Sequence, residues 1–305
     1  MRRTKGFVTA AAVCAVTGAL VAAAGSAPLP PPANALLGGG SVGTRTAPGH
    51  ADVKFTSIQI SPDGTRLHFY GDWNARCDGG GVVTASFDEI VRISADGSFS
   101  GTGPVKSEVA DGTFEFRGKL SRVALGGRSL DAARGTGRVR FAFRPDATRT
   151  HACDTAQVEW QARTTPKVTG KARPKNGGTY YGNTSDTLPF VMRVSPDGKQ
   201  IVQAAALFVL DCNNRVEPIL DAEIAPATPI GRSGSFVSVE RSEETVRAAE
   251  LWGEGSVMKY VAVFHGKFGT WAVRGGLTVK ATVTARDGTT VDICASRPLS
   301  FAASL

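Results

Sequence analysis

One tetrapeptide occurs twice in this chain, and the residues around it recur in the same order. Residues 61–64 read Ser-Pro-Asp-Gly, and residues 195–198 repeat them 134 positions later. Matches that keep their order along a chain predict a duplicated unit, so we expect the two halves to fold alike. The further matches are Cys77 with Cys212, residues 97–99 with 234–236, residues 112–120 with 269–277, and Cys153 with Cys294.

The N-terminus has the layout of an export signal. Three basic residues among the first five precede an apolar run at residues 7–24, and small residues follow it. A basic start, a short apolar core and a small-residue cleavage site are typical of a secretory signal peptide. We expect residues 1–35 to be removed by a cut after Ala35, with residues 22–24 as a second site. The protein is then extracellular or held in the cell envelope, with no membrane span after cleavage. A retained anchor is the alternative.

Removal of this segment takes away Cys14 and leaves four cysteines, which are Cys77, Cys153, Cys212 and Cys294. An even number of cysteines in an exported chain predicts structural disulfides. Four thiols allow three connectivities, and the repeat selects Cys77 with Cys153 and Cys212 with Cys294. Zinc is the rival interpretation, but the chain has no Cys-x-x-Cys pair and no histidine at ligand spacing.

The two halves read as strands separated by tight turns. Asp-Gly pairs recur, as at residues 63–64 and 197–198, and supply the positive φ that two-residue hairpins need. A helix start signal occurs at residues 242–251, where Ser242 is a candidate cap. We expect an all-β protein of two tandem antiparallel β-sandwich domains, Ig-like or jelly-roll-like, with one disulfide in each.

Composition places the boundaries of the two units. Residues 36–50 contain three consecutive glycines and are expected to form a flexible tether. Residues 51–164 then form the first sandwich, and residues 179–305 the second. Residues 165–178, which contain Pro, Lys and Gly without apolar periodicity, are expected to be a linker.

The second half carries a recognisable pattern. Residues 180–184 read Tyr-Tyr-Gly-Asn-Thr, followed by residues 190–194, the turn at 195–199 and Cys212. This pattern resembles a repeat in exported proteins of high-GC Gram-positive bacteria, most of them of unknown function. The resemblance implies export and a β-sandwich fold, and it transfers no catalytic residue. The first half lacks the Tyr-Tyr-Gly opening.

The charge distribution argues against a nucleic-acid partner. The formal charge is +8, but three basic residues lie in the signal segment and four lie between residues 167 and 175. The two folded units are therefore close to neutral, whereas binding to phosphates depends on an excess of cations.

Catalytic and metal patterns are weak. Ser256 and Lys259 match Ser-x-x-Lys, but the segment reads as a strand, which would put the two side chains on opposite faces. His68 and His151 approach one another only if their strands pair through the first disulfide. Asp and Asn flank Cys77 as candidate calcium ligands, but both residue types are typical of turns. We expect no catalytic residue, no metal and no cofactor.

Aromatic side chains are the remaining candidates for ligand contact, because exposed rings stack on sugars. Trp160 and Trp271 are expected in the core. The candidate platform consists of Tyr70, Trp73, Tyr180, Tyr181 and Trp252.

These features predict a non-catalytic secreted or cell-envelope protein with a binding or structural role. The partners that fit are a cell-wall or extracellular polysaccharide, or a protein. A carbohydrate-binding module is one alternative. A secreted hydrolase with an unrecognised site is the other, and it would require paired carboxylates in a cleft.

Overall fold

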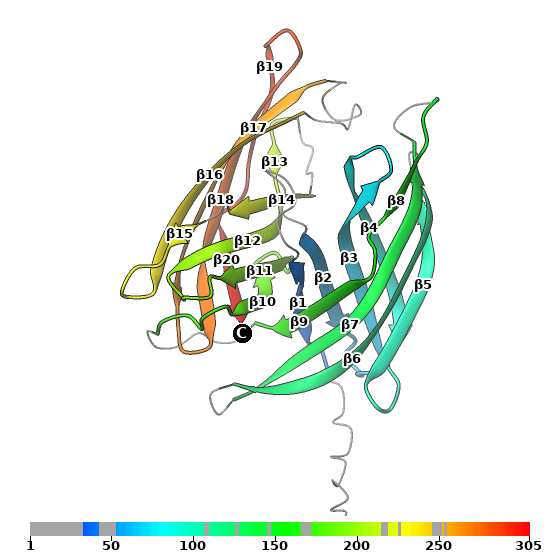
Figure 1. Cartoon of the computed structure of the whole chain (residues 1–305), viewed down its shortest axis with the longest axis vertical. Helices are drawn as coiled ribbons and strands as arrows, with labels where there is room; N and C mark the ends of the chain where they lie inside the picture. Colours follow the sequence, from blue (N-terminus) through cyan, green and yellow to red (C-terminus); the bar gives the residue numbers. More distant parts are fainter. Residues whose placement is uncertain are drawn as a thin grey trace, which may run out of the picture.

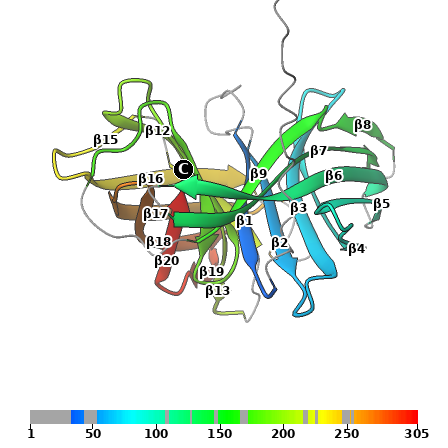
Figure 2. The ribbon, with the colours of Figure 1, turned by 90° about the horizontal axis from the view of Figure 1, so that it is seen from below.

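The computed structural model describes residues 33–42, 53–106, 110–125, 128–144, 148–165, 172–214, 219–224, 227–245, 252 and 255–305. The described residues form two antiparallel sheets, each curled around its own core (Figures 1 and 2). The all-β expectation is confirmed. Within this part of the chain, no helix is long and apolar enough to cross a bilayer. The expected signal segment lies outside the described residues, apart from its last three.

The first sheet contains nine strands. They are β1 (Leu36–Val42), β2 (Val53–Ile60), β3 (Arg66–Cys77), β4 (Val82–Arg92), β5 (Ser98–Lys106), β6 (Ala110–Leu125), β7 (Arg128–Phe143), β8 (His151–Asp154) and β9 (Val158–Thr164). Their order in space is β4-β3-β2-β1-β9-β7-β6-β5, and β8 pairs with both β3 and β7.

The second sheet contains eleven strands. They are β10 (Thr179–Thr184), β11 (Pro189–Val194), β12 (Gln200–Val209), β13 (Asp211–Cys212), β14 (Ile219–Ile224), β15 (Thr228–Pro229), β16 (Ser235–Thr245), β17 (Val257–Phe268), β18 (Ala272–Thr284), β19 (Thr290–Ala295) and β20 (Leu299–Ser304). Hydrogen bonds join them in the order β14-β12-β11-β10-β20-β18-β17-β16, while β19 pairs with β13 and β18.

The two strand orders run in parallel. When β10 is matched with β1, the strands on either side of it match as well. The corresponding pairs are β11 with β2, β12 with β3, β16 with β5, β17 with β6, β18 with β7, β19 with β8 and β20 with β9. The Ser-Pro-Asp-Gly turns connect corresponding strands, and Gly64 and Gly198 adopt φ values of 70° and 72°, a region that favours glycine. One sequence match disagrees with this correspondence. Residues 112–120 lie on β6, whereas residues 269–277 lie mainly on β18, the counterpart of β7.

The sandwich arrangement is not confirmed. The strands of each half belong to one hydrogen-bonded sheet, and its two ends fold toward each other instead of forming two separate sheets. Long strands explain the difference: β6 and β7 have 16 residues each, enough to bend around the core and contribute to both sides of it.

The core of each unit follows the period-two alternation of its strands. In β6, Phe114 and Phe116 point inward while Glu115 and Arg117 are exposed. Phe69 of β3 stacks on Phe116 with ring centroids 3.9 Å apart. The second unit is built the same way around Phe190 and Phe301, which stack at 4.2 Å.

The expected tether contains a strand in the middle of the first sheet. β1 pairs with β2 on one side and β9 on the other, and only residues 43–50 of the tether lie outside the described residues. The glycines serve close packing, since a Cβ at Gly38 would collide with Gly182 and Asn183 of β10. Composition misled because runs of glycine are typical of flexible segments, whereas here the backbone is hydrogen-bonded on both sides.

The two sheets contact each other directly. β1 and β9 pack against β10, and a small apolar cluster of Val53, Phe55, Ala205 and Leu207 lies between the sheets. Part of the expected linker is also anchored, since the Lys175 amide donates to the Tyr180 hydroxyl at 2.9 Å. Residues 166–171 are outside the described part.

The expected helix is wrong over its first part. Residues 242–245 continue β16 and pair with β17, with Glu243 opposite Lys259. The tertiary pairing overrides the local capping signal. Residues 246–251 lie outside the described residues.

Candidate functional site

The cysteines pair as the repeat predicted. Cys77 bonds to Cys153 and Cys212 bonds to Cys294. In both cases the two residues lie directly opposite each other, on β3 and β8 and on β13 and β19. Each disulfide therefore joins two strands of the same sheet.

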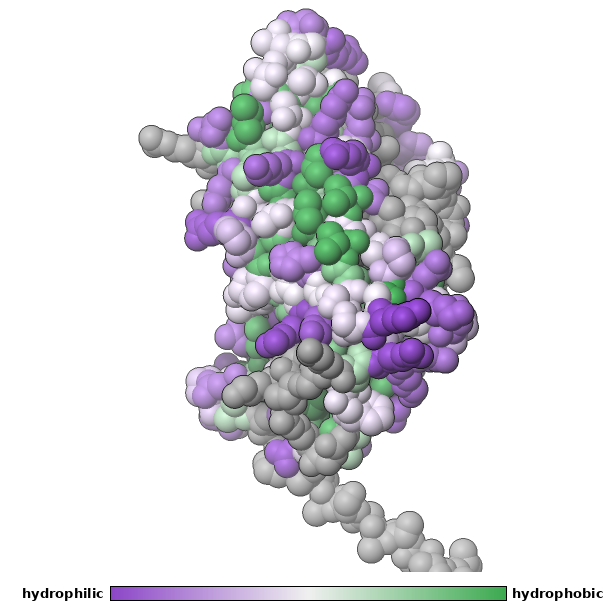
Figure 3. All heavy atoms as spheres, turned by 90° about the vertical axis from the view of Figure 1, so that its left-hand side faces the viewer, coloured by the Kyte–Doolittle hydropathy of each residue, from purple (hydrophilic) through white to green (hydrophobic). Residues whose placement is uncertain are grey.

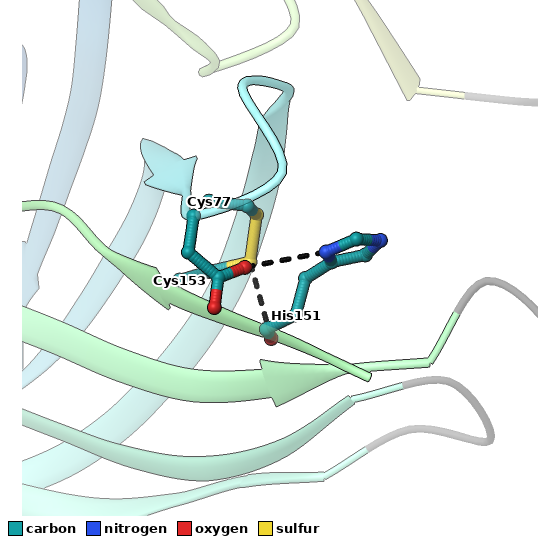
Figure 4. The surroundings of a disulfide bond; sticks show 4 residues. Cys77, His151 and Cys153 are labelled. Atoms are coloured by element: carbon teal, nitrogen blue, oxygen red, sulfur yellow. Dashed lines mark hydrogen bonds and ion pairs between the residues drawn. A yellow bond between two sulfur atoms is a disulfide. The ribbon is translucent and has the colours of Figure 1, made fainter. Parts of the chain in front are cut away.

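The surroundings of the first disulfide are polar (Figure 4). His151 Nδ1 lies 3.2 Å from Asp78 Oδ1 beside the bridge. A hydrogen bond from the Ala152 backbone, together with His151, lowers the pKa of Asp78. His151 is half-buried and Asp78 is exposed, and their contact joins the turn after β3 to the start of β8.

Two members of the aromatic platform are core residues. Trp73 is fully buried, and its indole N–H donates to the Phe55 carbonyl at 3.0 Å. Tyr180 is also buried and packs against Phe268. Neither ring can stack on a sugar, so the five-residue platform is wrong.

The other three candidate aromatics are half-buried and lie in separate places. The Tyr70 hydroxyl donates to Asp72 at 3.3 Å, and burial with that neighbouring carboxylate raises the pKa of Tyr70. Tyr181 lies under Arg163, whose Cζ is 5.7 Å from the ring centroid. The Trp252 indole donates to Asp292 at 2.8 Å.

The two tryptophans expected in the core have different fates. Trp160 is buried among Phe69 and Phe99, as predicted. Trp271 is 41% exposed, and it lies in the turn between β17 and β18 and not within a strand.

The catalytic candidates from the sequence, Ser256, Lys259 and the two histidines, are engaged in other contacts. The Ser256 hydroxyl is buried and donates to the Trp252 carbonyl at 2.6 Å, while Lys259 forms an ion pair with Glu243 at 3.2 Å. His68 lies 2.9 Å from Asp88, and Ser86 donates to Asp72 instead of to a histidine. His68 and His151 have different carboxylate partners and form no pair.

The calcium candidates are engaged in strand contacts. Asp72 accepts from Ser86 at 2.7 Å, and Asn74 accepts from Thr84 at 2.7 Å. In the described part of the chain, only Cys212, Asp292 and Cys294 gather as a metal-type cluster. The two sulfur atoms are joined in the disulfide, and the Asp292 carboxylate accepts from Trp252 and two backbone amides.

A hollow of about 1100 Å³ lies on the outer face of the first sheet, and we call it the first hollow. Its wall comes from residues 98–100 of β5, 117–119 of β6, 134–136 of β7 and 159–161 of β9, with Tyr181 of the second sheet at one side. Its charged side chains are Arg92, Arg117, Lys119, Arg134 and Glu159.

A second hollow, of about 710 Å³, lies on the outer face of the second sheet. It is lined by residues 235–237 of β16, 265–267 of β17, 274–275 of β18 and 300–302 of β20. These strands are the counterparts of β5, β6, β7 and β9. The two hollows therefore occupy the same place in the two strand orders.

The floor of each hollow is a pair of glycines on adjacent strands. Gly118 lies opposite Gly135, and Gly266 lies opposite Gly275. A methyl group at Gly118 would lie 2.6 Å from ring atoms of Phe99 and Trp160, which fill the inner side of the sheet. Phe236 and Phe301 cover the second pair in the same way. Paired glycines backed by aromatic rings are typical of sharply curved sheets.

These glycines were missed in the sequence, although a signal exists. Both halves contain a glycine between two basic residues, at residues 117–119 and 265–267, and an Arg-Gly dipeptide on the next strand, at 134–135 and 274–275. The register that brings each pair together is visible only in the structure.

Apolar side chains also reach the surface of the second sheet (Figure 3). Val237 and Ile293 are 66% and 54% exposed. They lie on β16 and β19, the first of which borders the second hollow.

No family model, curated protein or solved structure matches this chain.

Proposed function

We propose that this protein is an exported, non-catalytic binding protein made of two copies of one ancestral unit, each closed by its own disulfide. The observation that carries the proposal is the pair of hollows at corresponding places on the two sheets. Both are open, both have a glycine floor, and both are bordered by basic side chains.

The absence of a reactive arrangement among the described residues supports binding over catalysis. A hydrolytic site needs a base next to a nucleophile, or two carboxylates facing one bond. Neither hollow provides two carboxylates, since Glu159 is the one carboxylate that lines the first and none lines the second.

Export is supported by the chemistry of the cysteines. Disulfides persist in oxidising compartments and are rare in the cytosol, and this chain contains two. A cut after Ala35 would leave Leu36, the first residue of β1, at the new N-terminus, so every strand would be kept and the hydrogen bond from the Ile60 amide to the Ala35 carbonyl would be lost.

The test is a depletion assay with the oxidised protein that comprises residues 36–305. The protein is mixed with insoluble cell-wall polysaccharide, and the fraction left in solution is measured, together with any soluble sugar released. We expect depletion without release. Release of sugar would support the hydrolase alternative, and no depletion from any wall preparation would refute the binding role.

A further inference from the structure

The basic residues beside the two glycine floors form matched pairs. Lys119 lies directly opposite Arg134 on β6 and β7, and Lys267 lies directly opposite Arg274 on β17 and β18. Like charges directly opposite each other on adjacent strands destabilise a sheet. The same unfavourable pairing occurs in both hollows.

The cations are largely uncompensated. Lys119 contacts Asp96 at 3.1 Å. For Arg134, Lys267 and Arg274, the structure shows no side-chain hydrogen bond or ion pair with any described residue. The lining of the first hollow contains four cationic side chains and one carboxylate, Glu159, and the lining of the second contains no carboxylate. An anionic group placed between the paired cations would relieve their repulsion.

The rest of the first hollow is lined mainly by hydroxyl and amide side chains, whereas most of the exposed lining of the second is apolar, with Val237 66% exposed. Ser98, Ser100, Thr136 and Gln161 line the first hollow, and Ser235 and Ser300 line the second. Such groups exchange hydrogen bonds with sugar hydroxyls, while Lys and Arg bind carboxylates through charge-assisted hydrogen bonds.

Nucleic acid fits the hollows less well. Single strands are bound by exposed aromatic rings on which bases stack. The aromatic residues at the two floors, Phe99, Trp160, Phe236 and Phe301, are buried and face the cores.

The two hollows lie on either side of the contact between the sheets. Tyr181 lines the first and Asn183 lines the second, and they are two residues apart on β10, which is about 7 Å along a strand. A polymer that spans both hollows would gain avidity from its two contacts.

We propose that the two hollows bind an acidic polysaccharide, with the pairs Lys119–Arg134 and Lys267–Arg274 contacting its anionic groups. This rests on the proposed binding function and names the class of ligand.

The test measures binding of the oxidised chain to polygalacturonate, with dextran as the neutral polymer and oligodeoxythymidylate as the nucleic acid. Three double variants are compared: K119Q/R134Q, K267Q/R274Q and, as a charge-matched control away from both hollows, R76Q/K280Q. Circular dichroism verifies that each variant is folded.

We expect polygalacturonate to bind, dextran not to bind, and each hollow variant to weaken binding about tenfold or more, as for the loss of a charged hydrogen bond. The control should stay within about twofold of the parent. Equal weakening by the control, or stronger binding of oligodeoxythymidylate through the same pairs, would overturn the proposal. Depletion by neutral wall polysaccharide without binding to polygalacturonate would refute the acidic ligand and leave the binding function standing.

Discussion

Lys267 on β17 lies directly opposite Arg274 on β18, so two cations share one cross-strand position at the edge of the second hollow. Without a ligand between them, the two cations repel each other and lower the stability of the free protein. K267Q should therefore raise the free energy of unfolding by about 0.2–1 kcal/mol. Urea denaturation measures this. K280Q is the comparison, since Lys280 lies opposite Val261 and Ala295 and should give no gain. A loss of stability in K267Q would contradict the repulsion.

The glycine floors should tolerate no side chain. G118A places a methyl group against the Phe99 and Trp160 rings, and overpacking of this kind costs about 1–3 kcal/mol. G81A is the matched control, because a Cβ at Gly81 meets no atom within 4 Å. Thermal denaturation of both variants checks the prediction, and equal midpoints would mean that the floor is not tightly packed.

The first strand should be essential. β1 lies between β2 and β9, so a chain that begins at residue 51 loses the hydrogen bonds on both sides. We expect this truncated protein to lack a cooperative unfolding transition, while a chain that begins at residue 36 unfolds cooperatively. A flexible tether would make the two chains equally stable.

The disulfides should each contribute strongly to stability. The bridges close loops with sequence separations of 76 and 82 residues, and such a cross-link restricts the unfolded chain by about 4 kcal/mol. C77S/C153S and C212S/C294S should both unfold at clearly lower urea concentrations. Because each variant keeps the other bridge, the two measurements also show whether the sheets unfold together.

Acid should weaken the repeated turns. Hydrogen bonds from Ser61 and Thr65 lower the pKa of Asp63 to about 2, and Ser195 and Lys199 lower the pKa of Asp197. When folding lowers the pKa of a carboxyl, that group stabilises the native state at any pH above its pKa in the unfolded chain. The stabilisation is lost as the pH falls through its pKa in the folded protein.

D63N should therefore lose less stability than the parent between about pH 4 and pH 2. This range lies between the ordinary pKa of an aspartate, 3.8, and the pKa of about 2 that Asp63 has in the folded protein. Melting temperatures across this range measure the effect. D186N, which lies outside both turns, should follow the parent. A D63N curve parallel to that of the parent would contradict a contribution of the Asp63 carboxylate to stability.

Cysteine pairing was predictable because the repeat reduced three connectivities to one. The inward position of Trp73 was also predictable, since it shares one face of β3 with Phe69 and Ala75 at period two. The hollows were not predictable. Their floors depend on Gly118 facing Gly135 and Gly266 facing Gly275, and such register is fixed by long-range pairing that local patterns do not encode.

Lysine footprinting tests the binding account most directly. The oxidised chain is acetylated with and without polygalacturonate, and the modification rate of each lysine is read by mass spectrometry. If the two cation pairs bind the ligand, it slows acetylation of Lys119 and Lys267 together and leaves that of Lys199 and Lys280 unchanged. Equal slowing of all four lysines, or of none, would contradict it.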